Sequence, residues 1–393
     1  MRIIVHDFAG HPFQVELSRS LARRGHQVLH LYSGSIVTPQ GALAKRPEDP
    51  DTFQIEPILL AEKVDKSKIL KRRKVDLEHG RRTVARMEAY KPEVVLSANT
   101  PLDAQKLMLD YAHSHGVHFA FWVQDLIGQA IKRLMAVKYL GLGWLAGSYY
   151  ANLENRLLAE SDKIVVISED FRPFLPKAVQ NTPRVHVVEN WAPLDEMPLR
   201  ERVNPWSEAH GFSDGLNFIY SGTLGMKHNP ELLVQLAVEL TGKGRMIVVT
   251  EGQSVEFLKR RMLELGLENL HLLPFQPFDV LPEMLASADV LVAVLEADAG
   301  VFSVPSKVLT YLCAGKPLLL AIPLENLAAR IATQTGAGLV VSPDDAEGFI
   351  ANARTLAGDE SKRSQMGQAG RAYAEKTFSI ETITDKFERI LKV

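Results

Sequence analysis

The chain has 393 residues, more than the roughly 250–300 that one hydrophobic core usually supports, so we expect two domains. Its composition is 46% apolar, 23% charged and 7% aromatic with a net charge of −2, which does not favour a nucleic-acid-binding protein. The single cysteine, Cys313, excludes a disulfide framework and a Cys-based zinc site, and it favours a reducing cytoplasmic setting.

The N-terminal residues carry no recognisable targeting signal. Residues 1–5 run directly into an apolar strand pattern, without the hydrophobic region of a signal peptide. No window holds the roughly 18 uninterrupted apolar residues of a spanning helix. We therefore expect a protein that does not cross a bilayer, although it can still lie against one.

The first half of the chain alternates apolar runs with helical patterns. Residues 33–61 lack periodicity, and we interpret them as a long surface excursion. The short apolar runs are typical of buried parallel strands, and they lie at 3–5, 28–31, 94–97, 118–123, 163–168 and 185–188.

Two loops at strand ends in this half carry candidate functional residues. The loop after the first strand contains Gly10 but no G-x-G-x-x-G, so a dehydrogenase is disfavoured. His11 at the helix start is a candidate phosphate or substrate ligand, or else a capping or structural histidine. Asp125 follows the strand at 118–123, where open sheets place ligand groups; the alternative is an N-cap of the next helix.

Two segments of this half indicate a possible membrane surface. Residues 63–91 hold eleven Lys or Arg and four Asp or Glu, which fits either a solvated helix face or attraction to anionic lipid. Residues 131–145 mix Lys and Arg with many large apolar residues, which fits either an interfacial helix or a buried core helix.

The second half repeats the alternation after a polar, proline-broken segment at 193–212, where we place the linker. Its predicted strands lie at 216–220, 245–250, 270–273, 290–295 and 318–322. Both halves therefore predict doubly wound parallel sheets of the α/β class, with the cleft between the domains as the default site.

The loop at 221–230 is the first candidate for binding phosphate in the second half. Gly222 and Gly225 allow close backbone approach, Lys227 can face a phosphate, and Pro230 marks the next helix. Glu251 and the Phe275-Gln276 pair lie in the loops that follow the next two strands.

A second candidate is the helix that begins after Pro305. Its first turn offers backbone N–H groups, the Ser306 hydroxyl and the Lys307 ammonium. A period of 100° per residue places Lys307, Thr310, Tyr311 and Ala314 on one side, which we interpret as free to meet a ligand. The alternative is an ordinary amphipathic helix with a solvated lysine.

The order of these short motifs resembles bacterial family 4 glycosyltransferases of the GT-B fold, closest to the branch that builds capsule, O-antigen and exopolysaccharide. The matching motifs are YSGTLGMK at 220–227, FQP at 275–277, ADV at 288–290, PSK at 305–307 and AGKP at 314–317. The resemblance implies an acceptor-side domain at 1–198, a nucleotide-sugar domain at 199–375 and a helix at 376–393 that crosses back to the first domain.

The resemblance also implies roles for the candidate residues. Lys227 and the start of the helix at Ser306 and Lys307 would hold the donor diphosphate, and Asp125 would face the acceptor and the transferred sugar. The full donor-side set is Gly10, Gly222, Lys227, Glu251, Phe275, Gln276, Ser306, Lys307 and Thr310, and the catalytic set is Asp125, Lys227 and His11.

The sequence departs from the family pattern at three positions. A pair of glutamates separated by seven residues is replaced by Phe302 and Thr310, so ribose recognition would fall to Glu296 or Asp298. An arginine that often follows the glycine of the diphosphate loop is replaced by Thr223, which leaves the lysines to supply positive charge.

The implied chemistry is retaining transfer of a sugar from a UDP- or GDP-linked donor to a lipid-linked or growing glycan acceptor. Negative charge grows on the leaving diphosphate, and a helix dipole with ammonium groups stabilises it without a metal. The departing phosphate would take the acceptor proton in a front-face attack, while Asp125 positions the acceptor or stabilises the oxocarbenium ion.

Two other functions remain open. A nucleotide-sugar epimerase of the same fold needs clustered acids and bases, for which His11, Asp125 and Glu251 are the candidates. A catalytically silent partner protein would explain Phe302 and Thr310. For the transferase we expect a cytoplasmic location, peripheral at the anionic inner face of the plasma membrane, and no nucleic-acid partner.

Overall fold

The computed structural model describes residues 1–35, 40–41, 43–60, 69–138, 142–225, 228–297, 300 and 304–392. The chain divides into two compact units: unit 1 is Met1–Glu189 with Ile380–Val393, and unit 2 is Asn190–Ser379. This division differs from the predicted boundaries at 198 and 375. The segment after 190 is held in unit 2, because Arg371 donates from Nη1 to the carbonyl oxygens of Met197 (2.9 Å) and Cys313 (2.7 Å).

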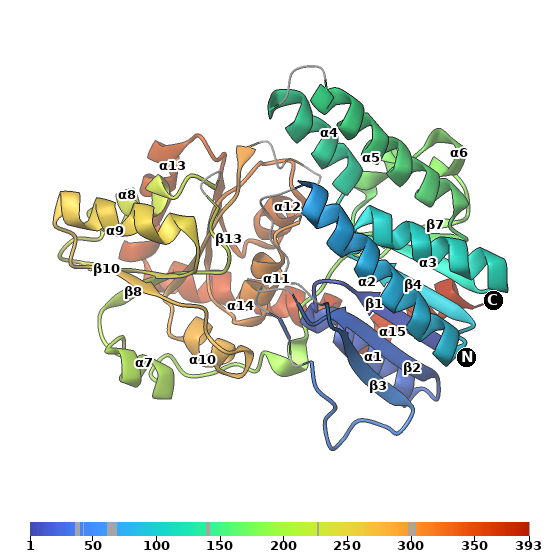
Figure 1. Ribbon diagram of the computed structural model, residues 1–393. Coiled ribbons are helices and arrows are strands. Elements are labelled where there is room, and N and C mark those ends of the chain that lie inside the picture. Colours follow the sequence, from blue (N-terminus) through green and yellow to red (C-terminus); the bar gives the residue numbers. More distant parts are fainter. Residues whose placement is uncertain are drawn as a thin grey trace. The chain divides into compact units, whose positions relative to one another are not determined.

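The described part of unit 1 contains a seven-stranded parallel sheet (Figure 1). Its strand order is β3 (Phe53–Ile58), β2 (Gln27–Ser33), β1 (Arg2–Asp7), β4 (Val94–Ala98), β5 (His118–Val123), β6 (Lys163–Val166) and β7 (Val185–Val187). The chain reverses its direction of progress across the sheet at β1 and β4. Open α/β sheets bind ligands at the carboxyl ends of the strands beside such a reversal.

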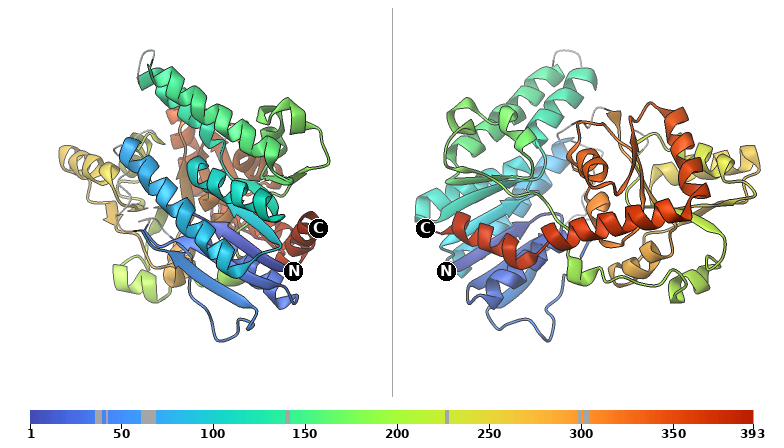
Figure 2. Two further views of the ribbon diagram at one scale, coloured as in Figure 1. Left: turned by 45° about the vertical axis from the view of Figure 1, so that its right-hand side comes forward. Right: turned by 180° about the vertical axis from the view of Figure 1, so that it is seen from behind.

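Helices cover both faces of this sheet, as right-handed crossovers require (Figures 1 and 2). The helices of unit 1 are α1 (Pro12–Arg23), α2 (Ile69–Tyr90), α3 (Leu102–His115), α4 (Ile127–Lys138), α5 (Leu142–Glu160), η1 (Glu169–Phe174), α6 (Lys177–Gln180) and α15 (Ile380–Leu391). Helix α2 packs on α3, and α1 packs on α15. The last helix is fixed to the sheet through Phe387, whose ring centroid lies 4.7 Å from that of Trp122 in β5.

The described part of unit 2 contains a six-stranded parallel sheet. Its order is β10 (Leu270–Leu273), β9 (Gly244–Val249), β8 (Leu216–Ser221), β11 (Val290–Val294), β12 (Leu318–Ala321) and β13 (Gly338–Val341). The reversal here falls between β8 and β11, so the loops that follow these strands occupy the ligand position of this sheet type. The core is formed by the buried side chains of these strands, among them Phe218, Tyr220, Val248 and Val292.

The helices of unit 2 are η2 (Leu194–Glu196), α7 (Pro205–His210), α8 (Glu231–Glu239), α9 (Gln253–Leu265), η4 (Phe278–Val280), α10 (Leu281–Ala286), α11 (Ser306–Cys313), α12 (Leu327–Thr335), α13 (Ala346–Gly358) and α14 (Glu360–Thr377). The segment predicted to be a linker therefore carries η2 and the short helix α7. Helix α7 is ordered by a capping box, in which Asn204 accepts from the backbone N–H of Trp206 and Ser207.

The predicted class, α/β with two doubly wound parallel sheets, is confirmed. Two strands escaped the sequence analysis, β3 and β13, and both lie at an edge of their sheet. Residues 33–61 are thus not a continuous surface excursion. Strand β3 alternates apolar and polar residues and contains Pro57, which an edge strand tolerates because one side needs no ladder hydrogen bond.

The two predicted membrane-surface segments fall partly outside the described residues. Residues 131–145 span the end of α4 and the start of α5, and the side chains at 133–144 lie outside the described part. Within the part of the chain that is described, no helix is both long and apolar enough to cross a membrane.

Candidate functional site

The carboxyl edge of the unit 1 sheet holds Asp7, His11 and Asn99 together. Asp7 is the last residue of β1 and is buried. One carboxylate oxygen accepts from the Ala9 backbone (3.1 Å) and from Asn99 Nδ2 (3.1 Å), and the other accepts from the His11 backbone N–H. His11 Nδ1 lies 3.4 Å from Asp7 Oδ1. This carboxylate therefore fixes the loop that carries His11.

The electrostatics of this pair favour the charged forms of both side chains. Burial by itself lowers the pKa of His11, but the negative charges of Asp7 and Asp125 and the hydrogen bond to Asp7 raise it above its ordinary value. Burial raises the pKa of Asp7, and contact with His11 outweighs it, so that the net pKa is lowered. Each of the two side chains therefore favours the charged form of the other.

Gly10 is required at its position for two reasons. Its φ of +76° lies in the left-handed region, which disfavours a side chain. A Cβ atom there would also lie 2.8 Å from Leu43 Cδ1 and 2.9 Å from Gln40 Nε2. Gly10 therefore serves the shape of the loop, and its predicted contact with a donor stays a prediction.

Asp125 lies just after β5 and is exposed. The alternative role of a helix cap is carried in part by another residue, because buried Glu154 accepts from the backbone N–H of Gly128 (2.9 Å) in the first turn of α4. Desolvation raises the pKa of Glu154 to about 7. The negative charge of Asp125 also helps to raise the pKa of His11, so the two predicted residues interact electrostatically.

The turn after β8 in unit 2 brings Gly222 and Lys307 together. Gly222 has a φ of +124°, and a Cβ atom on it would lie 3.1 Å from Lys307 Cε and 3.2 Å from Lys307 Nζ. Lys307 Nζ donates to Tyr220 Oη at 2.5 Å and lies 3.8 Å from the centroid of that ring. Two predicted donor-side residues from different elements therefore meet in unit 2.

The predicted ligand-facing side of α11 was wrong at two positions. Tyr311 and Ala314 are buried, with 1% and 8% of their surface exposed. Tyr311 accepts from the backbone N–H of Ser221 (2.8 Å) and donates to its carbonyl (3.1 Å), because α11 lies against the end of β8. Ser306 is exposed, as predicted for a residue that meets a ligand.

Thr310 is half-buried one turn after Ser306. Its hydroxyl donates back to the Ser306 carbonyl at 3.4 Å. This bond is internal to the helix, and a threonine offers no carboxylate to a ribose. The structure thus gives no substitute for the family glutamate at this position.

The loops after β9 and β10 are tied to each other. The Phe275 backbone N–H donates to Glu251 Oε1 at 3.3 Å. Gln276 accepts from the indole N–H of Trp206 (3.0 Å) and donates to the Pro274 carbonyl (3.0 Å). These predicted donor-side residues are therefore neighbours, and Gln276 also anchors α7 through Trp206.

Three of the residues named in the sequence analysis lie outside the described part of the chain: Lys227, Asp298 and Phe302. Their predicted roles stay predictions. The sequence analysis in turn missed Asp7, Asn99 and Tyr220. A polar residue at the end of a predicted strand was a signal for Asp7, whereas Tyr220 looked like an ordinary core residue.

No group of three or more metal-binding side chains occurs among the described residues. The sequence contains one D-x-D triplet, an acidic pattern that binds metal in other glycosyltransferases, at Asp49-Pro50-Asp51. Arg19 Nε donates to both carboxylate oxygens of Asp49, at 2.9 and 3.1 Å, in the interior of unit 1. This carboxylate is therefore part of a buried ion pair.

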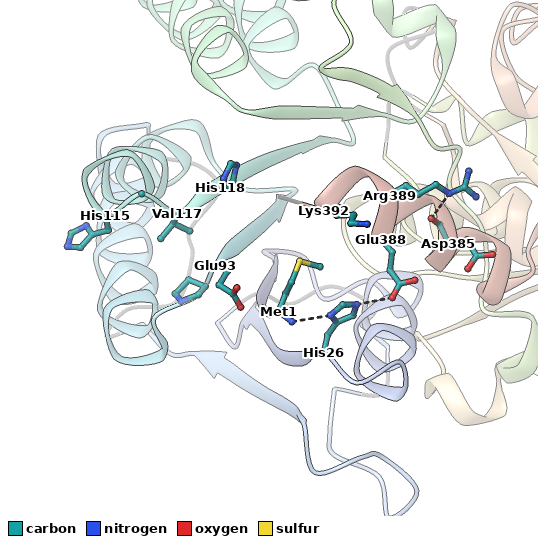
Figure 3. A pocket seen from close by; sticks show the side chains of 12 residues that line it. Met1, His26, Glu93, His115, Val117, His118, Asp385, Glu388, Arg389 and Lys392 are labelled. Atoms are coloured by element: carbon teal, nitrogen blue, oxygen red, sulfur yellow. Dashed lines mark hydrogen bonds and ion pairs between the residues drawn. The ribbon is translucent and has the colours of Figure 1, made fainter.

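An open pocket of about 900 Å³ lies at the opposite, amino-terminal edge of the unit 1 sheet (Figure 3). It is lined by Met1, Glu93, His118 and the end of α15. Its acidic groups are already engaged: Glu388 pairs with Arg24 (2.7 Å), and the Arg2 backbone N–H donates to Glu93 (2.5 Å). The predicted residues of unit 1 lie at the other edge, the carboxyl edge of the sheet.

Comparisons with known proteins define the class. Residues 13–196 match the model described as Glycosyltransferase Family 4, and residues 204–373 match the model described as Glycosyl transferases group 1. The two parallel sheets and these matches define a glycosyltransferase of the GT-B fold. The chain belongs to the family 4 glycosyltransferases, as its motifs predicted.

A curated relative and two solved structures are similar to this chain. Over 171 residues the chain is 26% identical to WcaI of Escherichia coli (strain K12), a glycosyl transferase named for colanic acid biosynthesis. That alignment covers 43% of this chain and only 41% of the relative.

Both structures match over nearly their full length. Anabaena HepE in complex with UDP-glucose has a TM-score of 0.71 at 14% identity and covers 100% of this chain and 99% of its own. WaaG, a glycosyltransferase involved in lipopolysaccharide biosynthesis, has a TM-score of 0.69 at 17% identity, with 99% of each chain covered. Similarity at these identities shows the shared fold.

Proposed function

We propose that this glycosyltransferase moves a sugar from a UDP- or GDP-linked donor to a lipid-linked or growing glycan in cell-surface polysaccharide biosynthesis. Family membership supports sugar transfer. The names of WcaI and WaaG support a polysaccharide or lipopolysaccharide product, and the UDP-glucose bound by Anabaena HepE supports a nucleotide-sugar donor.

The pairing of Gly222 with Lys307 is the observation that carries the proposal. A lysine nitrogen lies 3.2 Å from the point where a side chain on Gly222 would begin, at the carboxyl end of β8. The exposed start of α11, with Ser306, is on the same chain segment. Positive charge and a helix N-terminus at this position stabilise a departing diphosphate more than the intact donor.

For unit 1 we propose acceptor-side roles. His11 and Asp125 interact electrostatically, since the negative charge of Asp125 helps to raise the pKa of His11. Asp125 would position the acceptor or stabilise the oxocarbenium ion, while the departing phosphate takes the acceptor proton. This scheme retains the anomeric configuration and needs no metal.

The decisive experiment incubates the purified protein with radiolabelled UDP-sugars and GDP-sugars and a bacterial membrane lipid extract. Labelled lipid or glycan supports the proposal. Donor isomerisation without transfer would instead indicate an epimerase, a function that no finding favours. Binding without turnover would indicate the silent partner that Thr310 allows.

Two additions to the same assay test the finer claims. Activity that persists in excess EDTA supports metal-independent transfer, and loss of activity contradicts it. Proton NMR of the first product reports the anomeric configuration, and an inverted product would contradict the retaining scheme.

A further inference from the structure

Lys307 contacts a neutral side chain, Tyr220, at the turn after β8 that contains Gly222. Its Nζ donates to Tyr220 Oη at 2.5 Å, and Tyr220 Oη donates in turn to the Thr223 carbonyl at 2.7 Å. The second bond commits the only phenolic proton to Thr223. The oxygen of Tyr220 must therefore accept from Lys307, which fixes the direction of the chain of bonds.

Among the residues that the structure describes, Lys307 has no counter-charge. Within the described ranges, no carboxylate lies at ion-pair distance from its nitrogen, and no charged side chain shifts its pKa. The titratable groups nearby are the phenols of Tyr220, from β8, and Tyr311, from α11 itself. Burial raises the pKa of both phenols, so both stay neutral. Desolvation lowers the pKa of Lys307 to about 7.

Gly222 leaves room for a ligand to reach this lysine. A methyl group there would lie 3.1 Å from Cε and 3.2 Å from Nζ, so a glycine keeps the turn and the lysine nitrogen in close approach. The next residue is Thr223, an uncharged side chain. Lys307 therefore brings a positive group to this turn from α11.

We propose that Tyr220 is a positioning residue that holds Lys307 at the Gly222 turn, and that Lys307 takes up one proton from solvent as the donor diphosphate binds. This inference rests on the proposed function and identifies how the donor site gains its positive charge. Amine and ammonium both have a hydrogen to donate to Tyr220, so the proton is gained without loss of that bond.

The sign of the pH dependence follows from linkage. An anion beside the lysine raises its pKa in the complex, so the complex binds more protons than the free protein. Affinity for the donor is then greatest below pH 7 and falls by about tenfold per pH unit above it. At pH 8 the free lysine is mostly neutral, and binding takes up close to one proton.

Isothermal titration calorimetry with UDP-glucose and GDP-mannose measures this uptake. Titrations at pH 8 in buffers of different ionisation enthalpy give the number of protons bound per ligand. Nucleotide sugars serve as the probe because their esterified diphosphates exchange no proton in this range. We expect nearly one proton for the wild type and none for Lys307→Met, with at least tenfold weaker binding of the variant at pH 7.

Lys307→Arg keeps a permanent charge, so its binding should take up no proton and should be independent of pH between 7 and 8.5. Lys316→Met is the matched control: Lys316 is another unit 2 lysine whose pKa is lowered by desolvation, but its neighbours are Asp289 and Arg202. This variant should behave as the wild type.

A double-mutant cycle tests the role of Tyr220. Tyr220→Phe should weaken binding of the nucleotide sugar about fivefold when Lys307 is present. In the Lys307→Met background the same substitution should not weaken binding further. Additive effects of the two substitutions would overturn the positioning role.

The remaining outcomes separate the inference from the function beneath it. Tight binding of a nucleotide sugar with no proton uptake at pH 8 overturns the inference and leaves the proposed function standing. Absence of binding to either nucleotide sugar removes the proposed function, and the inference with it.

Discussion

The two units present opposite electrostatic arrangements at equivalent edges of their sheets. In unit 1 the charge of His11 is matched by buried Asp7 at 3.4 Å. In unit 2 the nitrogen of Lys307 faces a neutral phenol at 2.5 Å. A charge paired with a buried counter-charge keeps its position whether or not a ligand is present. A charge beside a neutral side chain gains its counter-charge from the ligand that binds.

The direction of each pKa shift expresses the same contrast. The pKa of His11 is raised, since its partners Asp7 and Asp125 outweigh burial. The pKa of Lys307 is lowered to about 7 by burial, and no charged side chain among the described residues offsets that shift. Under the proposed function, the partners of His11 in unit 1 favour its charged form before any ligand binds, whereas Lys307 in unit 2 would gain its charge as the donor binds.

Lys227→Ala should have the largest effect on this comparison. A second lysine on the donor loop would carry much of the charge that stabilises the leaving diphosphate, so we expect turnover to fall by ~10²–10³-fold. Thermal unfolding should change far less than turnover, because the sequence predicts Lys227 in a loop and substitutions outside the core usually cost little stability. Turnover equal to the wild type would remove Lys227 from the site and leave Lys307 as the main donor-side cation.

Asp7→Asn would break the matched pair of unit 1 while keeping its shape. Loss of the negative charge should lower the pKa of His11, and kcat/KM should fall by about 10–100-fold, as for other residues that orient a functional side chain. NMR titration of His11 and steady-state kinetics check the two effects. Asp110→Asn, at an exposed carboxylate paired with Lys106, is the control and should change neither. An unaltered His11 titration in Asp7→Asn would disprove the pairing.

The sequence predicted the fold well because its central strands are apolar on both faces. Residues 3–5 and 290–294, for example, are buried throughout. The two missed strands, β3 and β13, lie at sheet edges, where one side faces solvent and the apolar pattern weakens. Edge strands depend on pairing with a neighbour, which a local pattern does not encode.

The sequence pointed to those candidate site residues whose type has few purely structural uses. Gly222, Lys307 and His11 stood out because glycine and charged residues at strand ends indicate ligands. Tyr220 did not, because a tyrosine in an apolar run is normally core, and Tyr311 was expected to face a ligand instead of the end of β8. Only the fold shows that one hydroxyl holds the lysine and the other holds the Ser221 backbone.

Acid should weaken unit 1 before unit 2. His6 and His79 are buried in unit 1 with 2.9 Å between their Nε2 atoms. Burial lowers the pKa of both, that of His79 to about 4. In the unfolded chain the pKa of both histidines returns to about 6.5. Their contribution to the stability of the fold is therefore complete above pH 6.5 and is lost as the pH falls towards 4. At pH 5 the loss from His79 is about 2 kcal/mol.

Hydrogen exchange resolved by peptide checks this difference between the units. Between pH 7 and pH 5, with intrinsic rates corrected, protection of β1 should fall more than protection of β8. His79→Gln removes one titrating group and should flatten the change in β1, while His115→Gln, at an exposed histidine, should not. Equal loss in both strands would contradict a stability difference based on these histidines.

Attraction of unit 1 to anionic membranes should be the weakest effect, because α2 already pairs much of its charge within the unit. Arg73 lies 3.4 Å from Asp103, Arg82 2.7 Å from Glu78, and Arg86 2.6 Å from Glu56. The structure thus favours a solvated helix face for part of this basic run. Exposed Lys74 and Arg81 have no such ion pair among the described residues.

Cosedimentation with phosphatidylserine vesicles tests what remains of this attraction. A basic residue near an anionic surface contributes ~1 kcal/mol, so Lys74→Gln and Arg81→Gln should each weaken binding about fivefold. Arg86→Gln is the matched control, because its charge is already neutralised by Glu56 and its loss should have a smaller effect. Salt should release the bound protein, since screening shortens the range of the attraction. Binding that is equal on neutral vesicles, or that resists salt, would show that α2 does not direct the protein to membranes.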